Sequence, residues 1–235
     1  MDHPSPIRDH ADRLPLTDAW RSLPPSSQRD LGAICTPHHT RRGESPPSDV
    51  LIIVSGVYGT LREMADGRRT LSALALGGDF LDFRRLERQR QGSLLTLADG
   101  EVLVPDIEAL DRLIWRDAAV ATAILQITRD AFARARDHCT DVATKTPLER
   151  LASALLELRR RVSGPPSDRF SLPLRRSDLA EYLGLKPETV SRGFRTLREE
   201  GFIEAENSGL ITFVNVPGLR MLANGGRPRR STRHL

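Results

Sequence analysis

The side chains best suited to chemistry lie between Pro187 and Gly201, on one face of an expected helix. This polar face carries Glu188, Thr189, Ser191, Arg192 and Arg195. Arginine can fork onto guanine, glutamate can accept from a cytosine amine, and hydroxyl groups reach base edges or phosphates in a major groove. The pattern favours DNA recognition over a polar face that is merely solvated.

Two short helical patterns position this face. Leu179, Ala180 and Leu183 form the apolar side of the first, and the second repeats apolar residues at Val190, Phe194 and Leu197. Gly184 breaks the chain between them, which is the layout of a helix-turn-helix. Pro187 suits a first helical turn, Glu188 complements the helix dipole, and Gly201 can end the helix. The alternative is an ordinary helical hairpin.

Charge is segregated along the 235 residues. Residues 145–235 contain 17 Lys/Arg and 10 Asp/Glu, a net of +7, which leaves a net of −3 for the residues before them. A basic C-terminal third behind an acidic front is typical of a DNA-binding domain attached to a separate sensing domain.

Composition excludes several classes of protein. Hydrophobic residues make up 39% and charged residues 28%, with no apolar run long enough for a bilayer and no signal-peptide layout at the N-terminus. We therefore expect a cytoplasmic protein with no membrane partner. Cys35 and Cys139 are the only cysteines, so neither a disulfide framework nor a four-cysteine zinc or iron–sulfur site is expected.

Residues 41–105 read as short β-strands. An apolar run covers 50–54, alternating segments cover 57–63 and 69–76, and further strands are expected at 93–97 and 101–104. Turn residues such as Gly56, Asp66-Gly67 and Gly77-Gly78 separate them. This spacing predicts a small β-barrel or jelly roll.

Two helices should follow, one over 106–115 and a long one over 117–144. In the long helix, heptad-like spacing predicts a coiled-coil seam between two copies of the chain. The residues expected at this dimer interface are Val120, Ile124, Ile127, Ala131 and His138. The alternative is packing of this face against the barrel of the same chain.

The remaining segments complete the predicted organisation. Thr146-Pro147-Leu148-Glu149 is a capping box that starts a helix to Val162, and two β segments flanking Asn207-Ser208-Gly209 predict a wing. We expect a flexible arm at 1–16, a β-roll at 17–116, a dimerisation helix at 117–145, a winged helix-turn-helix at 146–223 and a disordered basic tail at 224–235. The fold class is α+β.

This order of parts resembles the Crp/Fnr family of bacterial transcription regulators over about residues 20–216. The most specific motifs are Asp178-Leu179-Ala180, Tyr182-Leu183-Gly184-Leu185 and Glu188-Thr189-Val190-Ser191-Arg192. The resemblance implies a cyclic-nucleotide-binding-like β-roll, a homodimer on double-stranded DNA, and RNA polymerase as a partner of the β-roll and the loop at 164–169.

The recognition helix resembles the Fnr/FixK type, which implies TTGAT half-sites in a palindrome. Glu188, Ser191 and Arg192 are then the base-reading residues. The residues expected on the DNA backbone are Arg175, Arg176, Thr189 and Arg195.

The front half departs from the liganded members of the family. Residues 79–94 lack the carboxylate–arginine pattern of a cyclic-nucleotide site, so neither cAMP nor an iron–sulfur cluster is expected, and the effector stays unknown. His38 and His39 are candidate ligands of haem or a metal, and the alternative is a pair of solvated side chains in a polar loop. His138 could titrate near neutral pH, or be a hydrogen-bonded interface residue. Cys35 and Cys139 are redox candidates or simply buried side chains.

Two other functions compete with signal-dependent regulation. One is a cupin-like metal enzyme that uses His38 or His39 and keeps the helix-turn-helix for assembly, but no histidine occurs between Arg41 and Ile114. The other is a DNA-binding protein whose front domain is a ligand-free scaffold. The pattern favours a regulator that is not an enzyme.

Overall fold

The computed structural model describes residues 10–15, 17–67, 69–84, 93–162, 168–206 and 209–226. The expected basic tail at 227–235 and most of the arm at 1–16 lie outside these residues. The chain divides into two compact units, one of residues 1–63 with 73–135 and one of residues 64–72 with 136–235. None of the described helices is both long and apolar enough to cross a membrane.

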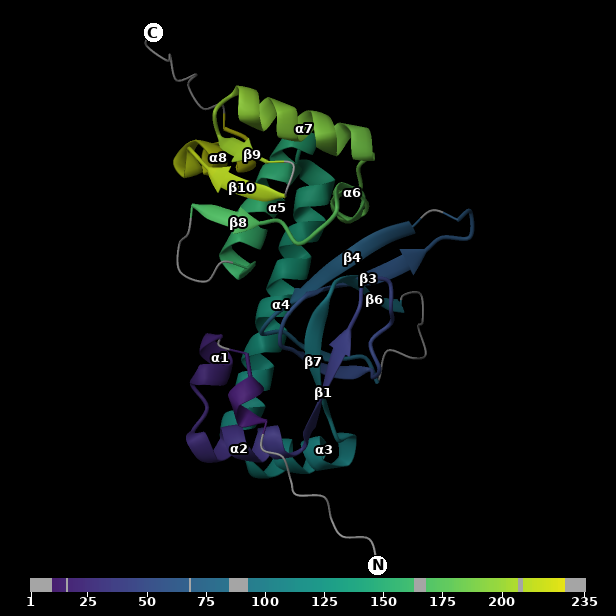
Figure 1. Ribbon diagram of the computed structural model, residues 1–235, viewed down its shortest axis with the longest axis vertical. Coiled ribbons are helices and arrows are strands. Elements are labelled where there is room, and N and C mark those ends of the chain that lie inside the picture. The colour runs from purple at the N-terminus through teal and green to yellow at the C-terminus, as the bar shows by residue number, and fades with distance from the viewer. Residues whose placement is uncertain are drawn as a thin grey trace, which may run out of the picture. The chain divides into compact units, whose positions relative to one another are not determined.

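The first unit contains a β-roll (Figure 1). One sheet has the order β1-β7-β2-β5 and a second has the order β4-β3-β6. The strands are β1 (Cys35–Thr40), β2 (Val50–Ile53), β3 (Val57–Glu63), β4 (Arg69–Leu76), β5 (Phe80–Asp82), β6 (Ser93–Ala98) and β7 (Gly100–Pro105). The expected β-roll is confirmed, while β1 and β5 had no counterpart among the expected strands.

Strand β2 explains why its sequence is apolar without alternation. Successive side chains of a strand point to opposite faces of the sheet. Leu51 and Ile53 enter a core cluster with Tyr58 of β3, whereas Val50 and Ile52 enter a different cluster with the helices. All four side chains of β2 are fully buried, so both faces require apolar residues.

Helices cover the outer side of this sheet. They are the 3-10 turn η1 (Ala11–Arg13), α1 (Asp18–Arg21), α2 (Pro25–Ala33), α3 (Ile107–Arg116) and α4 (Ala118–Thr144), whose first part belongs to this unit. Trp20 of α1 is 1% exposed, and its indole N–H donates to the carbonyl of Gly78 over 2.9 Å. Asp79 accepts from Arg134 of α4 over 2.6 Å, which ties the β4–β5 turn to that helix.

The second unit is a winged helix-turn-helix. It contains α5 (Pro147–Val162), α6 (Arg176–Leu183), α7 (Pro187–Glu199), α8 (Val216–Ala223) and a sheet of order β8-β10-β9. The strands are β8 (Arg169–Ser171), β9 (Ile203–Ala205) and β10 (Leu210–Phe213). The predicted capping box is present, because Thr146 N–H donates to the Glu149 carboxylate over 2.8 Å. The expected α+β class is confirmed.

Candidate nucleic-acid interface

Helix α7 has the beginning and end that its sequence predicts. Lys186 precedes it in an extended conformation, and Pro187 occupies the first turn. Gly184 and Gly201 have φ angles of 63° and 73°, a left-handed region that glycine enters without steric cost. These two glycines let the chain turn sharply on both sides of α7 and fix its length.

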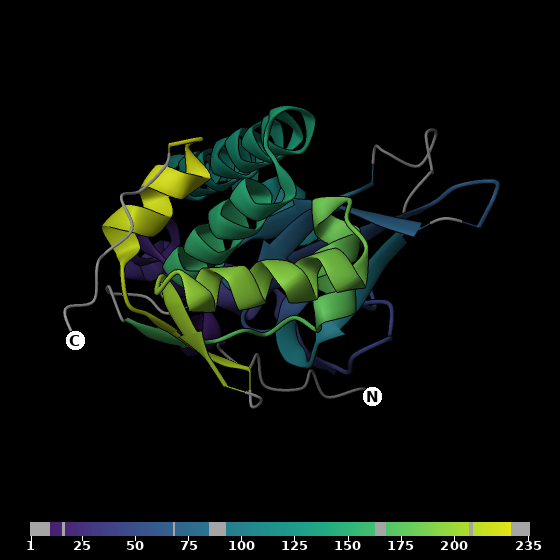
Figure 2. The ribbon, with the colours of Figure 1, turned by 90° about the horizontal axis from the view of Figure 1, so that it is seen from above.

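The inner face of α7 packs into the core of the second unit. Val190, Phe194 and Leu197 are at most 4% exposed. Gly193 lies so close to α5 that a Cβ there would stand 2.7 Å from Leu151 Cδ2. Figure 2 shows α7 lying across α5 in this unit. This close packing holds the opposite face of α7 toward solvent.

The outer face of α7 presents the predicted base-reading residues together. Glu188, Ser191 and Arg192 are exposed, as is Arg195 one turn further on. Their spacing of three and four residues places them on one side of the helix. Thr189 is half-buried and accepts from Arg192 Nη2 over 3.5 Å. Within the described ranges no ion pair holds Arg192 or Arg195, so both guanidinium groups are available to an acidic partner.

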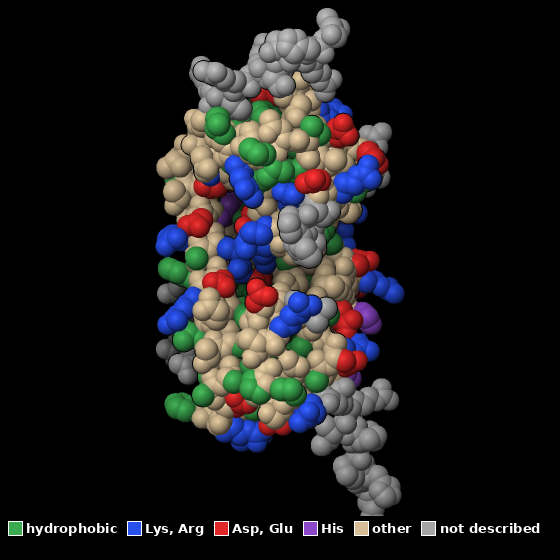
Figure 3. All heavy atoms as spheres, turned by 90° about the vertical axis from the view of Figure 1, so that its left-hand side faces the viewer, with side chains coloured by type: hydrophobic (Ala, Val, Ile, Leu, Met, Phe, Trp, Pro, Cys, Tyr) green, Lys and Arg blue, Asp and Glu red, His purple; other side chains and the backbone are tan. Residues whose placement is uncertain are grey.

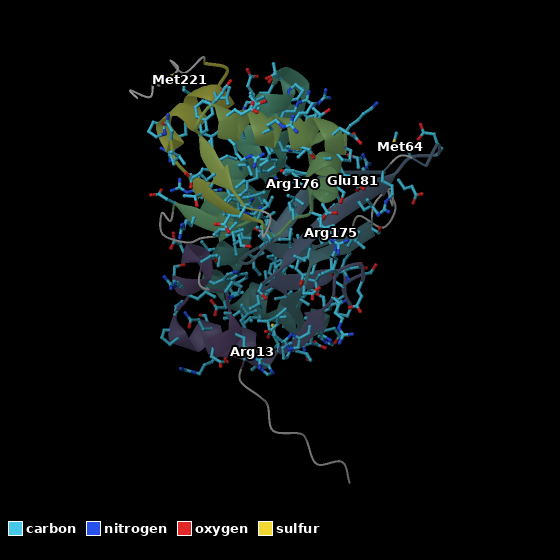
Figure 4. All side chains as sticks on the ribbon, turned by 45° about the horizontal axis from the view of Figure 1, so that its top comes forward. Arg13, Met64, Arg175, Arg176, Glu181 and Met221 are labelled. Carbon is cyan, nitrogen blue, oxygen red and sulfur yellow. The ribbon has the colours of Figure 1, made fainter. Side chains whose placement is uncertain are left out.

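Arg175 and Arg176 stand side by side in sequence but differ in environment (Figure 4). Arg175 is exposed just before α6, and its N–H donates to the buried carboxylate of Asp178 over 3.1 Å. The guanidinium carbon of Arg176 lies 3.1 Å from the ring centroid of Phe194. Its Nη1 atom is buried without a hydrogen-bond partner among the described residues. The side chain as a whole is half-buried, so the expected contact of Arg176 with the DNA backbone stays a prediction.

The wing consists of β9 and β10, which pair antiparallel with Ile211 opposite Ala205. Strand β8, which the sequence pattern did not predict, adds a third strand with Ile211 opposite Phe170. Phe170 and Phe213 are in ring contact at 5.6 Å between centroids, and both are 4% exposed. The wing is thereby anchored through aromatic packing, while Asn207 and Ser208 at its expected turn lie outside the described residues.

His138 makes a ring contact that the sequence analysis did not predict. It stacks on Tyr182 of α6 with 3.9 Å between ring centroids and 5° between ring planes. This contact lies within one chain and His138 is half-buried, so its place at the dimer interface stays a prediction. On the same helix, the carbonyl of Glu181 accepts from Thr70 Oγ1 over 3.3 Å. Figure 4 shows Met64, where the β3–β4 hairpin begins, on the same side as Glu181.

A pH decrease is expected to weaken this stack. Burial lowers the pKa of His138 below its ordinary value of 6.5, and Arg150 lowers it further, although Asp141 and a hydrogen bond to the Tyr182 backbone act in the opposite direction. The unfolded chain therefore binds the proton more readily than the folded one. The stabilising contribution is complete above pH 6.5 and is lost as the pH falls below it.

A His138→Phe variant keeps a flat ring against Tyr182 but cannot titrate. Between about pH 7.5 and 5.5 we expect the melting temperature of the wild type to fall more than that of this variant. The comparison by circular dichroism cancels the other histidines, which both proteins share. Equal falls would show that His138 does not couple protonation to stability.

The predicted seam on α4 is occupied by the chain itself. Val120 is 0% exposed and Ile127 5% exposed, in a cluster with Trp20, Leu31 and Leu110, and Ile124 packs against the same cluster. A side chain with no exposed surface has nothing to bury against a second copy. The prediction is wrong for Val120 and Ile127, and the alternative of intrachain packing applies to this face of α4. Ala131 is half-buried and stays a prediction.

A different stripe of α4 is exposed. Leu125 is 48% exposed and Phe132 is 72% exposed, seven residues apart, and exposed Cys139 follows after another seven. The residues that alternate with them at heptad spacing are Thr128 and Ala135, with Ala121 before Leu125 and Val142 after Cys139. On the face drawn in Figure 3, charges of both signs are interspersed and hydrophobic side chains show in small groups. Large exposed side chains that repeat every seven residues indicate an interaction surface more strongly than isolated ones do. We call this set the heptad stripe.

The other candidate residues, His38, His39 and Cys35, are not gathered into one site among the described residues. His38 and His39 lie in strand β1 and not in a loop, and as neighbours in a strand they point to opposite faces. In the described ranges no group of three or more His, Cys, Asp or Glu residues is arranged for a metal. Cys35 is buried, and burial raises the pKa of its thiol to about 12, which makes it a poor nucleophile near neutral pH. Residues 85–92, in the expected ligand-binding stretch, are not described.

Two features of the structure escaped the sequence analysis. The heptad stripe has a periodicity as regular as that of the buried face, so the pattern alone could not say which face was exposed. The contact of Arg176 with Phe194 joins residues 18 positions apart, and only the presence of an aromatic residue on the inner face of α7 hinted at it.

Comparisons with known proteins agree with this geometry. The model of the Crp-like helix-turn-helix domain matches residues 149–222. The chain is 32% identical over 178 residues to the nitrogen fixation regulation protein FixK of Azorhizobium caulinodans, a match that covers 74% of this chain and 71% of that protein. It is 32% identical over 167 residues to the transcriptional activator protein FnrL of Cereibacter sphaeroides, covering 67% and 65% of the two chains. The structure of FixK2 from Bradyrhizobium japonicum has a TM-score of 0.67 at 28% identity, covering 80% of this chain and 97% of that one.

Proposed function

Because this chain belongs to the Crp/Fnr family of bacterial transcription regulators, and so is a DNA-binding regulator, we propose that two copies together read a palindromic site with TTGAT-type half-sites. The observation that carries this proposal is the outer face of α7. Glu188, Ser191 and Arg192 are exposed on one side of a helix whose other side is fixed in the core.

Each base-reading residue has a chemical role in this proposal. Arg192 forks onto O6 and N7 of a guanine, Glu188 accepts from a cytosine amine, and Ser191 donates to a base edge or contacts a thymine methyl group. Arg175, Thr189 and Arg195 hold phosphates and set the register of the helix without reading sequence. Arg192 and Arg195 make no ion pair with the described residues, so DNA binding does not have to break one.

Two-fold symmetry supplies the palindrome. We propose that the heptad stripe of α4, centred on Leu125 and Phe132, is the interface between the two copies. A coiled coil buries large side chains at such positions by inserting each into a hole on the facing helix. Two copies of α7 would then enter successive major grooves about 34 Å apart.

The remaining organisation follows from this assignment. We propose a β-roll domain at 17–116, a dimerisation helix at 117–145 and a DNA-binding domain at 146–223, acting in the cytoplasm where the DNA lies. RNA polymerase is the further partner that we propose, because a relative is named a transcriptional activator. The relatives are regulators, which favours this function over a cupin-like metal enzyme.

Binding to a spacer series tests the proposal. A duplex with TTGAT and its inverted repeat, with half-site centres about 10 base pairs apart, should bind at least about 1,000-fold more tightly than a scrambled duplex at physiological salt. Inserting about 5 base pairs rotates one half-site to the opposite side of the DNA and should remove most of this preference. Equal affinity for all three duplexes in fluorescence anisotropy would overturn the proposal.

A further inference from the structure

We infer that Arg176 is a positioning residue of the DNA-reading unit, which holds α6 against α7 through the ring of Phe194 and contacts no phosphate itself. This inference rests on the proposed function, because it concerns the same DNA-reading surface. It separates Arg176 from Arg175 and Arg195, although all three are arginines at the expected DNA side.

The geometry is that of a cation resting on an aromatic face. Arg176 is the first residue of α6, and its guanidinium carbon lies 3.1 Å from the centroid of the Phe194 ring. Phe194 is 4% exposed, so its ring belongs to the core of the unit. Guanidinium groups stack on aromatic rings because they are flat, weakly hydrated and attracted by the negative ring face. The contact therefore joins the beginning of α6 directly to the middle of α7.

The partial burial of Arg176 is consistent with a packing role. Its Nη1 atom has no exposed surface and no hydrogen-bond partner within the described part of the chain. Burial lowers the pKa of Arg176 to about 10, with a further contribution from the charge of Arg198, so the group stays charged near neutral pH. The side chain of Arg176 as a whole is half-buried. Arg195, by contrast, is exposed on the outer face of α7.

The position of Phe194 explains how Arg176 affects DNA reading. Phe194 follows Arg192 by two residues in the same helix, so a shift of the ring moves the base-reading face. Leu179 of α6 and Val190 of α7 are both fully buried, but apolar packing is less directional than a cation on a ring face. Loss of the stack should therefore loosen the placement of Arg192 while leaving the number of phosphate contacts unchanged.

Salt dependence distinguishes positioning from phosphate contact. The logarithm of affinity falls linearly with the logarithm of salt concentration, and we use the magnitude of this slope. Each phosphate contact adds about 0.9 to that magnitude, and a dimer makes each contact twice. For Arg176→Met we expect a slope equal to that of the wild type and a specific-to-non-specific affinity ratio about tenfold lower, comparable to one mismatched base pair. The control Arg195→Met should lower the slope by about 1.8 and reduce specific and non-specific binding alike.

Conservative variants complete the experiment. Arg176→Lys keeps the charge but has no flat face, so it should show the same loss of ratio as Arg176→Met. Phe194→Leu removes the ring while keeping an apolar core, and it should lower the ratio at an unchanged slope. Circular dichroism checks that each variant folds. If Arg176→Met does not fold, the salt slope and affinity ratio of Phe194→Leu test the inference.

Each outcome decides the inference. A slope reduced by about 1.8 in Arg176→Met with an unchanged ratio would make Arg176 a phosphate contact, and an unchanged slope and ratio would make the stack dispensable. If the wild type itself showed no preference for the palindrome, the proposed site would fail. The slopes on scrambled DNA would still report whether Arg176 binds phosphate.

Discussion

Replacing Leu125 and Phe132 together by glutamate is expected to convert the protein into monomers and to weaken binding to the palindrome by at least about a hundredfold. Leu125 is 48% exposed and Phe132 is 72% exposed in one chain, so the change removes little intrachain packing. In a coiled coil, the new carboxylates of the two copies would face each other across the two-fold axis and repel. A monomer would then bind a single half-site and would lose the affinity gained when a linked second copy binds the other half-site.

The matched control carries the same charge change on the same helix. Gln126→Glu with Thr140→Glu alters two exposed residues, each one position beyond the heptad stripe, and should leave the dimer intact. Light scattering measures the mass of each variant. A dimeric Leu125→Glu, Phe132→Glu protein would show that the heptad stripe is not the interface. An Ile127→Glu variant would not answer this question, because Ile127 is 5% exposed and its replacement would unfold the first unit.

Cys139 provides a second readout for the same prediction. It is exposed on α4, seven residues after Phe132, so the thiols of two copies should lie within reach of a disulfide. Mild oxidation of the wild type should give a linked dimer, whereas Cys139→Ser should give none. Buried Cys35 should not substitute for it.

Replacing Arg192 by alanine is expected to remove most sequence discrimination while retaining salt-sensitive binding to any duplex. A bidentate contact with guanine contributes about 1–3 kcal/mol, and a dimer on a palindrome makes it twice. The expected loss is about 2–6 kcal/mol, or roughly 30-fold to 20,000-fold in affinity for the specific site. Arg192 is exposed and bonds only weakly to Thr189, so stability should change little.

Anisotropy titrations on the TTGAT palindrome and a scrambled duplex measure this loss. A paired test replaces the half-site guanine by adenine: the wild type should lose affinity, whereas Arg192→Ala should no longer distinguish the two duplexes. Arg192→Lys should recover little, because an ammonium group does not fork onto O6 and N7 as a guanidinium does. An unchanged specificity ratio in Arg192→Ala would remove Arg192 from the base-reading residues.

Much of the DNA-reading unit could be predicted from the sequence because its signals are local. Pro187, Gly184 and Gly201 fix the ends and turns of the helix pair through the conformations that those residues allow. Val190, Phe194 and Leu197 mark the inner face of α7 by their spacing, and all three are buried. Once that face is buried, the exposure of Glu188 and Arg192 on the other side follows from helical geometry.

The assignment of faces on α4 could not be predicted in the same way. This helix has apolar residues on two faces, one containing Val120 and Ile127 and the other Leu125 and Phe132. Periodicity shows that each face can be buried, but it does not show whether the same chain or a second copy buries it. The neighbours that cover Val120 and Ile127, among them Trp20 and Leu31, are distant in sequence, and their packing against α4 is a tertiary event.

By itself, the sequence determined the order of β-roll, long helix and winged helix-turn-helix, together with the exposed polar side of α7. Backbone preferences and hydrophobic spacing act over a few residues, so they can be read along the chain. Only the tertiary structure decided that Val120 and Ile127 belong to the core, that His138 stacks on Tyr182, and that Arg176 lies on Phe194. The contact of Arg176 with Phe194 spans 18 positions and that of His138 with Tyr182 spans 44, and these partners are chosen by the shape and burial of the folded chain.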